Sequence, residues 1–160
     1  MRNIKTFESF ADSSSGNIEL AVGLYEDLEK GSDVSLSGGN CGQSAYAVYR
    51  WMRENTGAKL EIGVLTNAED EEWLVDGEPD VYHVVVVVDG TPIDETGVLT
   101  GESLLSIAKD QYLDLDPSYH IFSMPEEERK VLRIISTSTN YTVDWNYFYD
   151  ILEPSTRHAR

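Results

Sequence analysis

The sequence predicts an α+β fold in which an antiparallel sheet packs against a buried helix. Helical spacing of apolar residues dominates the start of the chain, strand alternation follows, and a hairpin signal joins two strands. The length of 160 residues suits one domain. We therefore expect a flexible lead-in over 1–16, a single domain over 17–153 and a basic tail over 154–160.

Two helices are expected before the sheet. From Asn17, a residue type that caps helices, apolar residues recur at helical spacing until Gly31. The serine- and glycine-rich stretch 31–40 predicts a loop. A second helix begins near Cys41, carries small and apolar residues on one face, and ends near Gly57.

The hydrophobic period then changes to that of strands. Residues 59–64 alternate between apolar and polar, which indicates a half-buried strand. Five consecutive valines within 82–88 predict a central strand covered on both faces. Asp89-Gly90 is typical of a tight hairpin turn, so we expect the chain to return antiparallel through 91–94.

The remaining segments give weaker signals. Residues 67–80 contain seven acids and no base, and we expect them to form a loop. Further elements are expected as a helix over 102–109, a short strand over 120–122, a helix starting near Pro125 and an amphipathic helix over 144–152.

Composition limits the classes of function. Twelve basic and 29 acidic residues give a net charge of −17, which argues against direct nucleic-acid binding and suits cationic partners. No segment is apolar enough to span a membrane, and the N-terminus lacks the apolar region of an export signal, so we expect a cytoplasmic protein. A single cysteine forms neither an internal disulfide nor a multi-thiolate zinc site.

Three residues suggest nucleophilic catalysis: Cys41, His83 and Asp94. Cys41 opens a predicted helix, where the helix dipole and the free N–H groups of the first turn stabilise a thiolate and an oxyanion. His83 starts the long strand. Counting back from the hairpin turn places Asp94 near Val85, close enough to His83 to accept the imidazole Nδ1–H. This chemistry needs no cofactor and no metal.

The segments GGNCGQSAYAVYRWM and YHVVVVVDGTPIDETG resemble the papain-like superfamily in its compact transglutaminase-like and NlpC-like forms, over residues 36–97. Those proteins place a nucleophilic cysteine at the start of a helix packed on an antiparallel sheet. The resemblance implies Cys41 as nucleophile, His83 as general base and acid, and Asp94 as the orienting residue. Many papain-like proteases bind the oxyanion with a glutamine shortly before the cysteine; here Asn40 or backbone N–H groups would replace it.

Simpler interpretations exist for each of these residues. A lone cysteine is often a buried apolar residue, and a histidine at a strand end often has only a structural hydrogen bond. Asp94 could be a turn residue that bonds its own backbone. His120, which has aromatic neighbours but no hairpin context, is the rival general base.

The acidic stretch before His83 also has two interpretations. It is either a solvated loop or a negative rim of the catalytic cleft. In the second case Glu71, Glu72 and Asp76 would steer a protein or peptide substrate rich in Lys or Arg.

Two functions are consistent with these observations. The first is cysteine-dependent acyl transfer on an amide bond, by a peptidase, deamidase or transglutaminase-like enzyme. The second is a non-enzymatic acidic protein that mimics nucleic acid and blocks a nucleic-acid-binding partner. The opening MRNIKTFESF resembles leader segments of tailed-phage proteins, which implies a viral source, in the host cytoplasm or the virion, and Leu24-Tyr25-Glu26 has the form of a leader cleavage site.

Overall fold

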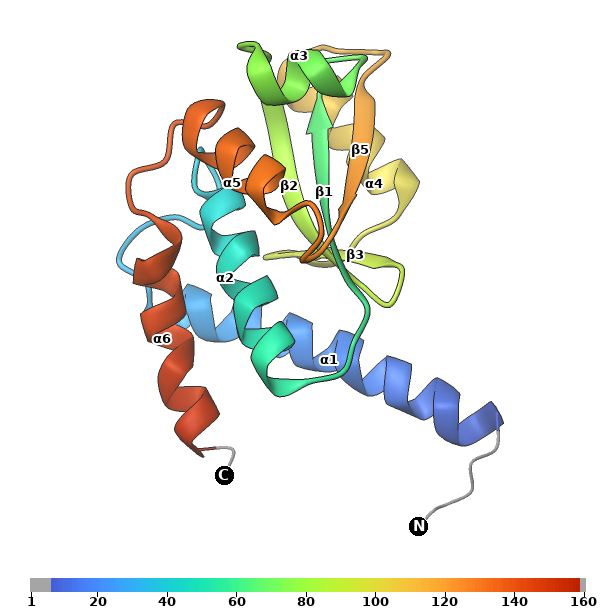
Figure 1. The fold of residues 1–160 in the computed structure, drawn as a ribbon, viewed down its shortest axis with the longest axis vertical. Coiled ribbons are helices and arrows are strands. Elements are labelled where there is room, and N and C mark those ends of the chain that lie inside the picture. The colour runs from blue at the N-terminus through green and yellow to red at the C-terminus, as the bar shows by residue number, and fades with distance from the viewer. Residues whose placement is uncertain (1–6, 159–160) are drawn as a thin grey trace.

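The computed structural model describes the backbone of residues 7–158 and the side chains of residues 16–153, and it confirms the α+β class. Helices α1, α2 and α6 lie together on one side of the sheet, and α4 lies behind the sheet in Figure 1. The elements, in chain order, are α1 (Phe7–Gly31), α2 (Cys41–Asn55), β1 (Leu60–Thr66), α3 (Glu71–Asp76), β2 (Val81–Val88), β3 (Thr91–Asp94), β4 (Gly97–Val98), α4 (Gly101–Ser106), the π-helix η1 (Ile107–Gln111), β5 (Ser118–Ser123), α5 (Glu128–Thr137) and α6 (Trp145–His158).

The sheet has five strands in the order β4-β3-β2-β1-β5, and every pairing is antiparallel. Strand β2 pairs with both β1 and β3, so the valine-rich strand lies inside the sheet, as predicted. Val84, Val86 and Val88 belong to the main core, which includes α1 and α2. Val85 and Val87 pack in a smaller cluster with residues of and before α4. Both faces of β2 are therefore covered.

The predicted hairpin turn is present between β2 and β3. Asp89 and Gly90 have φ angles of 49° and 87°, as a type I′ turn requires at both central positions. Val88 pairs with Thr91, and continuing this register places Asp94 beside Val85. The turn therefore fixes which residue of β3 lies near the start of β2.

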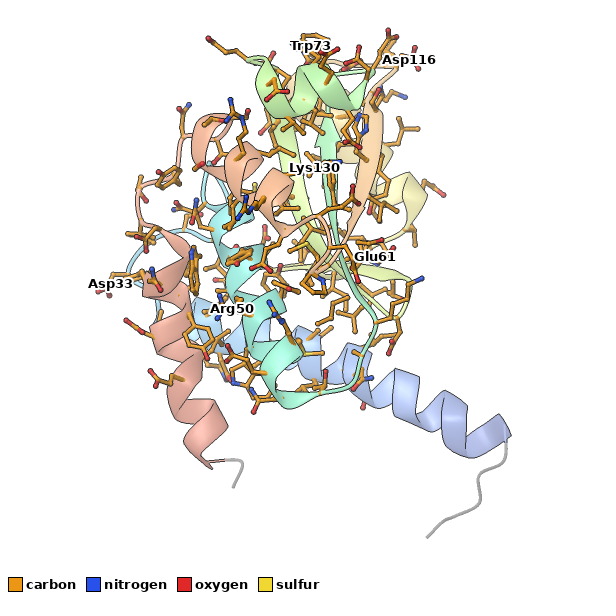
Figure 2. All side chains as sticks on the ribbon, viewed as in Figure 1. Asp33, Arg50, Glu61, Trp73, Asp116 and Lys130 are labelled. Carbon is orange, nitrogen blue, oxygen red and sulfur yellow. The ribbon has the colours of Figure 1, made fainter. Side chains whose placement is uncertain are left out.

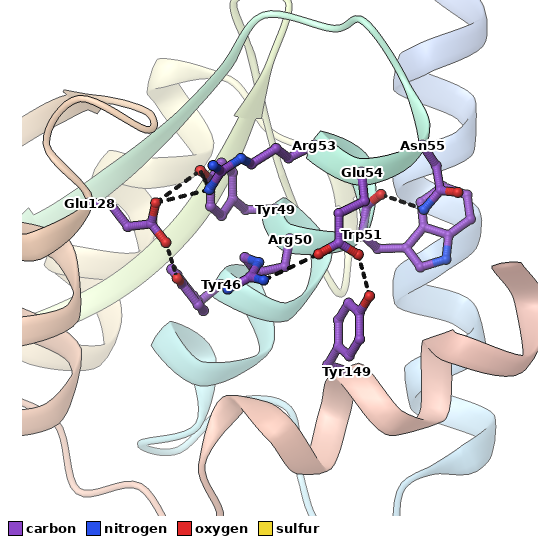
Figure 3. Close-up of polar contacts among 9 residues, drawn as sticks. All are labelled: Tyr46, Tyr49, Arg50, Trp51, Arg53, Glu54, Asn55, Glu128 and Tyr149. Atoms are coloured by element: carbon purple, nitrogen blue, oxygen red, sulfur yellow. Dashed lines mark hydrogen bonds and ion pairs between the residues drawn. The ribbon is translucent and has the colours of Figure 1, made fainter.

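Helix α2 starts where the sequence predicts, and it is buried for most of its length. Figure 3 shows that polar contacts fasten it to the helices on either side. Glu128 of α5 accepts hydrogen bonds from the Tyr46 hydroxyl and, at 3.1 Å, from the Arg53 guanidinium. On the other side, the Tyr149 hydroxyl of α6 donates to Glu54. These contacts hold α2 in one position relative to the sheet.

Helices extend across both predicted limits of the domain. Helix α1 begins at Phe7, inside the segment predicted as a flexible lead-in, and α6 continues to His158. The run 13–16 does not end the helix, because Ser and Gly each cost at most about 1 kcal/mol in a helix, while each added residue gains a hydrogen bond. Leu24 and Tyr25 are buried in α1, so the predicted cleavage site lacks the exposure that proteases require.

The weaker predictions for the second half of the chain are confirmed as elements with shifted bounds. The helix expected over 102–109 is α4 followed directly by η1, and the short strand is β5, at the edge of the sheet beside β1. Helix α5 starts at Glu128, shortly after Pro125. Within the described part of the chain, no helix has the length and apolarity needed to cross a bilayer.

Candidate active site

The structure brings His83 and Asp94 into direct contact. His83 Nε2 lies 2.6 Å from Asp94 Oδ2, and both residues are buried, with 7% and 2% of their surface exposed. The other carboxylate oxygen accepts hydrogen bonds from the Thr96 N–H at 2.8 Å and the Thr96 hydroxyl at 2.6 Å. Asp94 is therefore held on one side by Thr96 and aimed at the imidazole on the other.

The ring nitrogen that contacts Asp94 is not the predicted one. The sequence-based hypothesis has Asp94 accept from Nδ1, whereas the structure uses Nε2. Hairpin register fixes the distance between two residues, but the rotamer of His83 decides which nitrogen faces the carboxylate. With Nε2 directed at Asp94, Nδ1 is the nitrogen left for Cys41. The orienting role of Asp94 is the same for either nitrogen.

Cys41 is the third member of this cluster. Burial lowers the pKa of His83, but the neighbouring side chains of Asp94 and Cys41 outweigh burial and raise it to about 10. Burial raises the pKa of Asp94, but the hydrogen bonds from His83 and Thr96 outweigh it and hold this pKa below its usual value. At neutral pH the geometry therefore favours an imidazolium between a carboxylate and the sulfur.

Asn40, predicted as an oxyanion donor, has a structural role instead. Its amide nitrogen donates to the Ser35 carbonyl at 2.8 Å and to the Thr142 hydroxyl at 3.0 Å, and its oxygen accepts from the Thr142 N–H at 2.8 Å. Because both amide hydrogens are used, this side chain has none left for an acyl oxygen. The sequence predicts either Asn40 or backbone N–H groups as oxyanion donors. The backbone N–H groups at the start of α2 are therefore the donors that remain.

Two glycines allow close packing around Cys41. A Cβ at Gly42 would lie 2.6 Å from Cγ2 of Ile135, so the first turn of α2 packs directly on α5. Gly39 has a φ of 105°, and a Cβ there would lie 2.2 Å from the carbonyl oxygen of Asn140. A larger residue at position 42 would move Cys41 away from α5. A larger residue at position 39 would move it away from Asn140, in the segment after α5.

Cys41, His83 and Asp94 line a cleft of about 1080 Å³. Its walls are the loop before α2, the start of β2, the β3–β4 turn, α4 with η1, and residues 138–140. Tyr82 stacks on Tyr112 with ring centroids 4.6 Å apart and forms part of the wall. Sequence reasoning missed η1 and 138–140 as walls, because no local pattern connects either segment with Cys41 or His83.

The three acids predicted to steer substrate lie outside this cleft: Glu71, Glu72 and Asp76. They belong to α3, a helix inside the stretch predicted as a loop, which begins where Asp70 accepts a hydrogen bond from the Trp73 N–H at 2.7 Å. Glu71 forms an ion pair with Lys130, and Asp76 forms one with Arg133, both on α5. Trp73 of α3 and Lys130 of α5 are labelled in Figure 2. Of the seven acids in this stretch, Asp80 lines the cleft.

Other candidates for chemistry are weaker. His120 lies on β5, and its Nε2 is 2.8 Å from the Ala68 carbonyl, outside the residues that line the cleft. His83, Asp94 and Glu95 offer three possible metal ligands within 4.8 Å of one another. A metal there would displace the hydrogen bonds that Asp94 already makes, so this donor set fits a proton-transfer pair better.

Comparisons with protein-family models, with curated proteins and with solved structures find no match for this chain. The case for a function therefore rests on the residues of the cleft and on their mutual geometry.

Proposed function

We propose that the protein is a cysteine-dependent acyl-transfer enzyme with a papain-like, transglutaminase-like core that acts on an amide bond. The observation that carries this proposal is the buried Asp94–His83 hydrogen bond beside Cys41, inside a cleft. A cysteine with only a packing role gains nothing from a buried carboxylate–imidazole pair next to its sulfur. Perturbed pKa values that cluster in a cleft are typical of catalytic sites.

The arrangement supports a two-step reaction. The Cys41 thiolate attacks the carbonyl carbon, and backbone N–H groups at the start of α2 bind the oxyanion. His83 then donates the Nδ1 proton to the leaving amine, which gives a thioester and a free amine. Water or a second amine attacks the thioester, His83 takes a proton from it, and the thiolate leaves. Asp94 keeps the ring oriented throughout.

The fold supports the same class of enzyme. The nucleophile begins a buried helix that packs on an antiparallel sheet, and the histidine and the aspartate come from two neighbouring strands. The chain order Cys, His, Asp is that of the resemblance noted from the sequence. A protein or peptide with an amide in an accessible segment is the substrate class that a cleft of about 1080 Å³ would take.

Alkylation by iodoacetamide at pH 6.5 tests this proposal. About 1% of an ordinary thiol with a pKa near 8.5 is ionised at that pH. We expect Cys41 to react at least about 10-fold faster in the native protein than in the urea-unfolded chain, because a neighbouring imidazolium favours attack by the sulfur. His83→Ala should remove this acceleration, and His120→Ala, which changes a histidine outside the cleft, should retain it.

Equal rates in the wild type and His83→Ala would contradict the proposal. Alkylation seen only in urea would show that Cys41 is a core residue that reagents do not reach. Circular dichroism of each variant at the same pH establishes that the fold has been kept.

The second candidate, an acidic binding protein that mimics nucleic acid, is favoured by one observation. The net charge is −17, and no lysine or arginine is among the described residues that line the cleft. Substitution of Cys41 by alanine separates the two functions: it abolishes acyl transfer and leaves binding to a basic partner unchanged.

A further inference from the structure

Glu95 is an acid of the cleft that the reaction above does not use. It follows Asp94 in the turn between β3 and β4, it is partly buried, and it lines the cleft. One of its carboxylate oxygens lies within 4.8 Å of a ring nitrogen of His83 and of a carboxylate oxygen of Asp94. Glu95 therefore stands beside the catalytic centre.

Glu95 has no cation of its own among the described side chains, because the one within 4.8 Å, His83, is paired with Asp94. Burial raises the pKa of Glu95, and the nearby negative charge of Asp94 raises it further. Its own backbone N–H and the charge of His83 act in the opposite direction, and Glu29 of α1 adds to the rise. Within the described side chains, Glu95 makes no ion pair.

The charges of the cleft agree with this. His83 is the one side chain lining the described cleft that can carry a positive charge, and its Nε2 is already directed at Asp94. Asp80 adds a further negative charge to the wall. A partly desolvated carboxylate that shares its one nearby cation with Asp94 is unfavourable, and a second cation bound in the cleft lowers that cost.

We propose that Glu95 binds a primary ammonium group of the substrate next to Cys41, and that the enzyme therefore prefers substrates that carry a primary amine close to the reacting amide bond. This inference rests on the proposed function and replaces the predicted steering by α3 with a contact inside the cleft. An organic ammonium fits better than a metal ion, since it donates hydrogen bonds to Glu95 without displacing those of Asp94. The ammonium belongs either to the acyl donor or to the amine that attacks the thioester. In the second case it first gives one proton to Glu95, because an ammonium nitrogen has no lone pair, and His83 takes the second proton as the new C–N bond forms.

Acylation by a matched pair of esters tests whether the ammonium belongs to the acyl donor. The probes are benzyloxycarbonyl-lysine p-nitrophenyl ester and its norleucine counterpart, which differ by one charged amine. The burst of p-nitrophenolate measures acylation of Cys41. For the wild type, the acylation rate with the lysine ester divided by that with the norleucine ester should be about 10-fold higher than the same ratio measured with free cysteine. Glu95→Gln should lose this preference, and Glu102→Gln, an exposed acid outside the cleft, should retain it.

Aminolysis tests whether the ammonium belongs to the amine that attacks the thioester. Acetyl-Cys41, formed with p-nitrophenyl acetate, is treated with n-butylamine, which is cationic, or with methoxyamine, which is neutral at pH 7.5. A preference for butylamine that Glu95→Gln reduces assigns the ammonium to the attacking amine. If Glu95→Gln changes neither the ester ratio nor the amine ratio, the proposal is overturned.

Alkylation separates this failure from failure of the proposed function. The wild type and Glu102→Gln should react equally fast with iodoacetamide, because both keep Cys41, His83 and Glu95. Fast alkylation with unchanged ratios would refute the role of Glu95 alone. Wild-type Cys41 that reacts no faster than the unfolded chain would refute the proposed function and this inference with it.

Discussion

Replacement of His83 by glutamine should change how the stability of the protein depends on pH. The pKa of His83 is raised from 6.5 to about 10 in the folded protein, by Asp94 and Cys41 against the effect of burial. Each tenfold change in proton affinity is worth about 1.4 kcal/mol, so full protonation of His83 stabilises the fold by about 5 kcal/mol. That is a large share of the roughly 5–15 kcal/mol that stabilises a typical domain.

The rise in the pKa of His83 on folding decides whether its contribution to stability grows or falls with pH. Below pH 6.5 the folded and unfolded chains both bind the proton, so the stabilisation is complete. As the pH rises above 6.5 the unfolded chain loses its proton first, and the stabilisation falls until the folded chain also loses its proton near pH 10. Between pH 6 and pH 9 this loss amounts to about 3 kcal/mol.

Urea unfolding at pH 6, 7.5 and 9 measures this loss, in Cys41→Ser and in the double variant Cys41→Ser/His83→Gln. Serine replaces the sulfur because a thiolate paired with an imidazolium binds one proton fewer than an unfolded thiol, which would offset the loss of the histidine proton in the wild type. The free energy of unfolding of Cys41→Ser should fall over this range by up to about 3 kcal/mol more than that of the double variant. Cys41→Ser/His120→Gln should follow Cys41→Ser, which controls for loss of a histidine. Parallel pH profiles for Cys41→Ser and the double variant would refute the claim that Asp94 keeps this imidazole protonated.

Three further substitutions test the packing and hydrogen bonds of the site by urea unfolding at pH 7. Asn40→Ala removes the hydrogen bonds to the loop before α2 and to Thr142, and should destabilise the fold by about 1–3 kcal/mol. Gly42→Ala places a Cβ 2.6 Å from Ile135 and should cost about 1–3 kcal/mol, whereas Gly57→Ala, where no atom lies within 4 Å, should cost under about 1 kcal/mol. Thr96→Val removes a hydroxyl that bonds Asp94 and should cost about 1 kcal/mol. Unchanged stability in any of these three variants would contradict the role assigned to that residue.

The sequence was most informative where local chemistry determines geometry. Asp89-Gly90 adopts the one type of turn that suits those residues, and the turn sets the register that brings Asp94 near His83. The start of α2 at Cys41 was also predictable, because a glycine-bearing loop precedes it and small residues follow it.

Features that depend on tertiary contacts were not predictable in the same way. Glu71 and Asp76 of α3 form ion pairs with lysine and arginine side chains of α5, which lie far along the chain, so these two charges hold α3 against α5. The side chain of Asn40 is taken up by Thr142, a residue that no local pattern connects with it. Thr96 could have been found, since Asp-x-Thr is typical of a turn in which the aspartate accepts from the residue two positions later.

The placement of the site residues along the chain has a consequence for synthesis. His83 and Asp94 are separated by 11 positions and share one hairpin, whereas Cys41 lies on a helix that is made before either strand. A chain leaves the ribosome from its N-terminus, so α2 emerges while its future partners are still untranslated. Under the proposed function, the unfinished chain therefore carries an incomplete site, which is assembled only after α2 docks on a sheet that already contains β2 and β3.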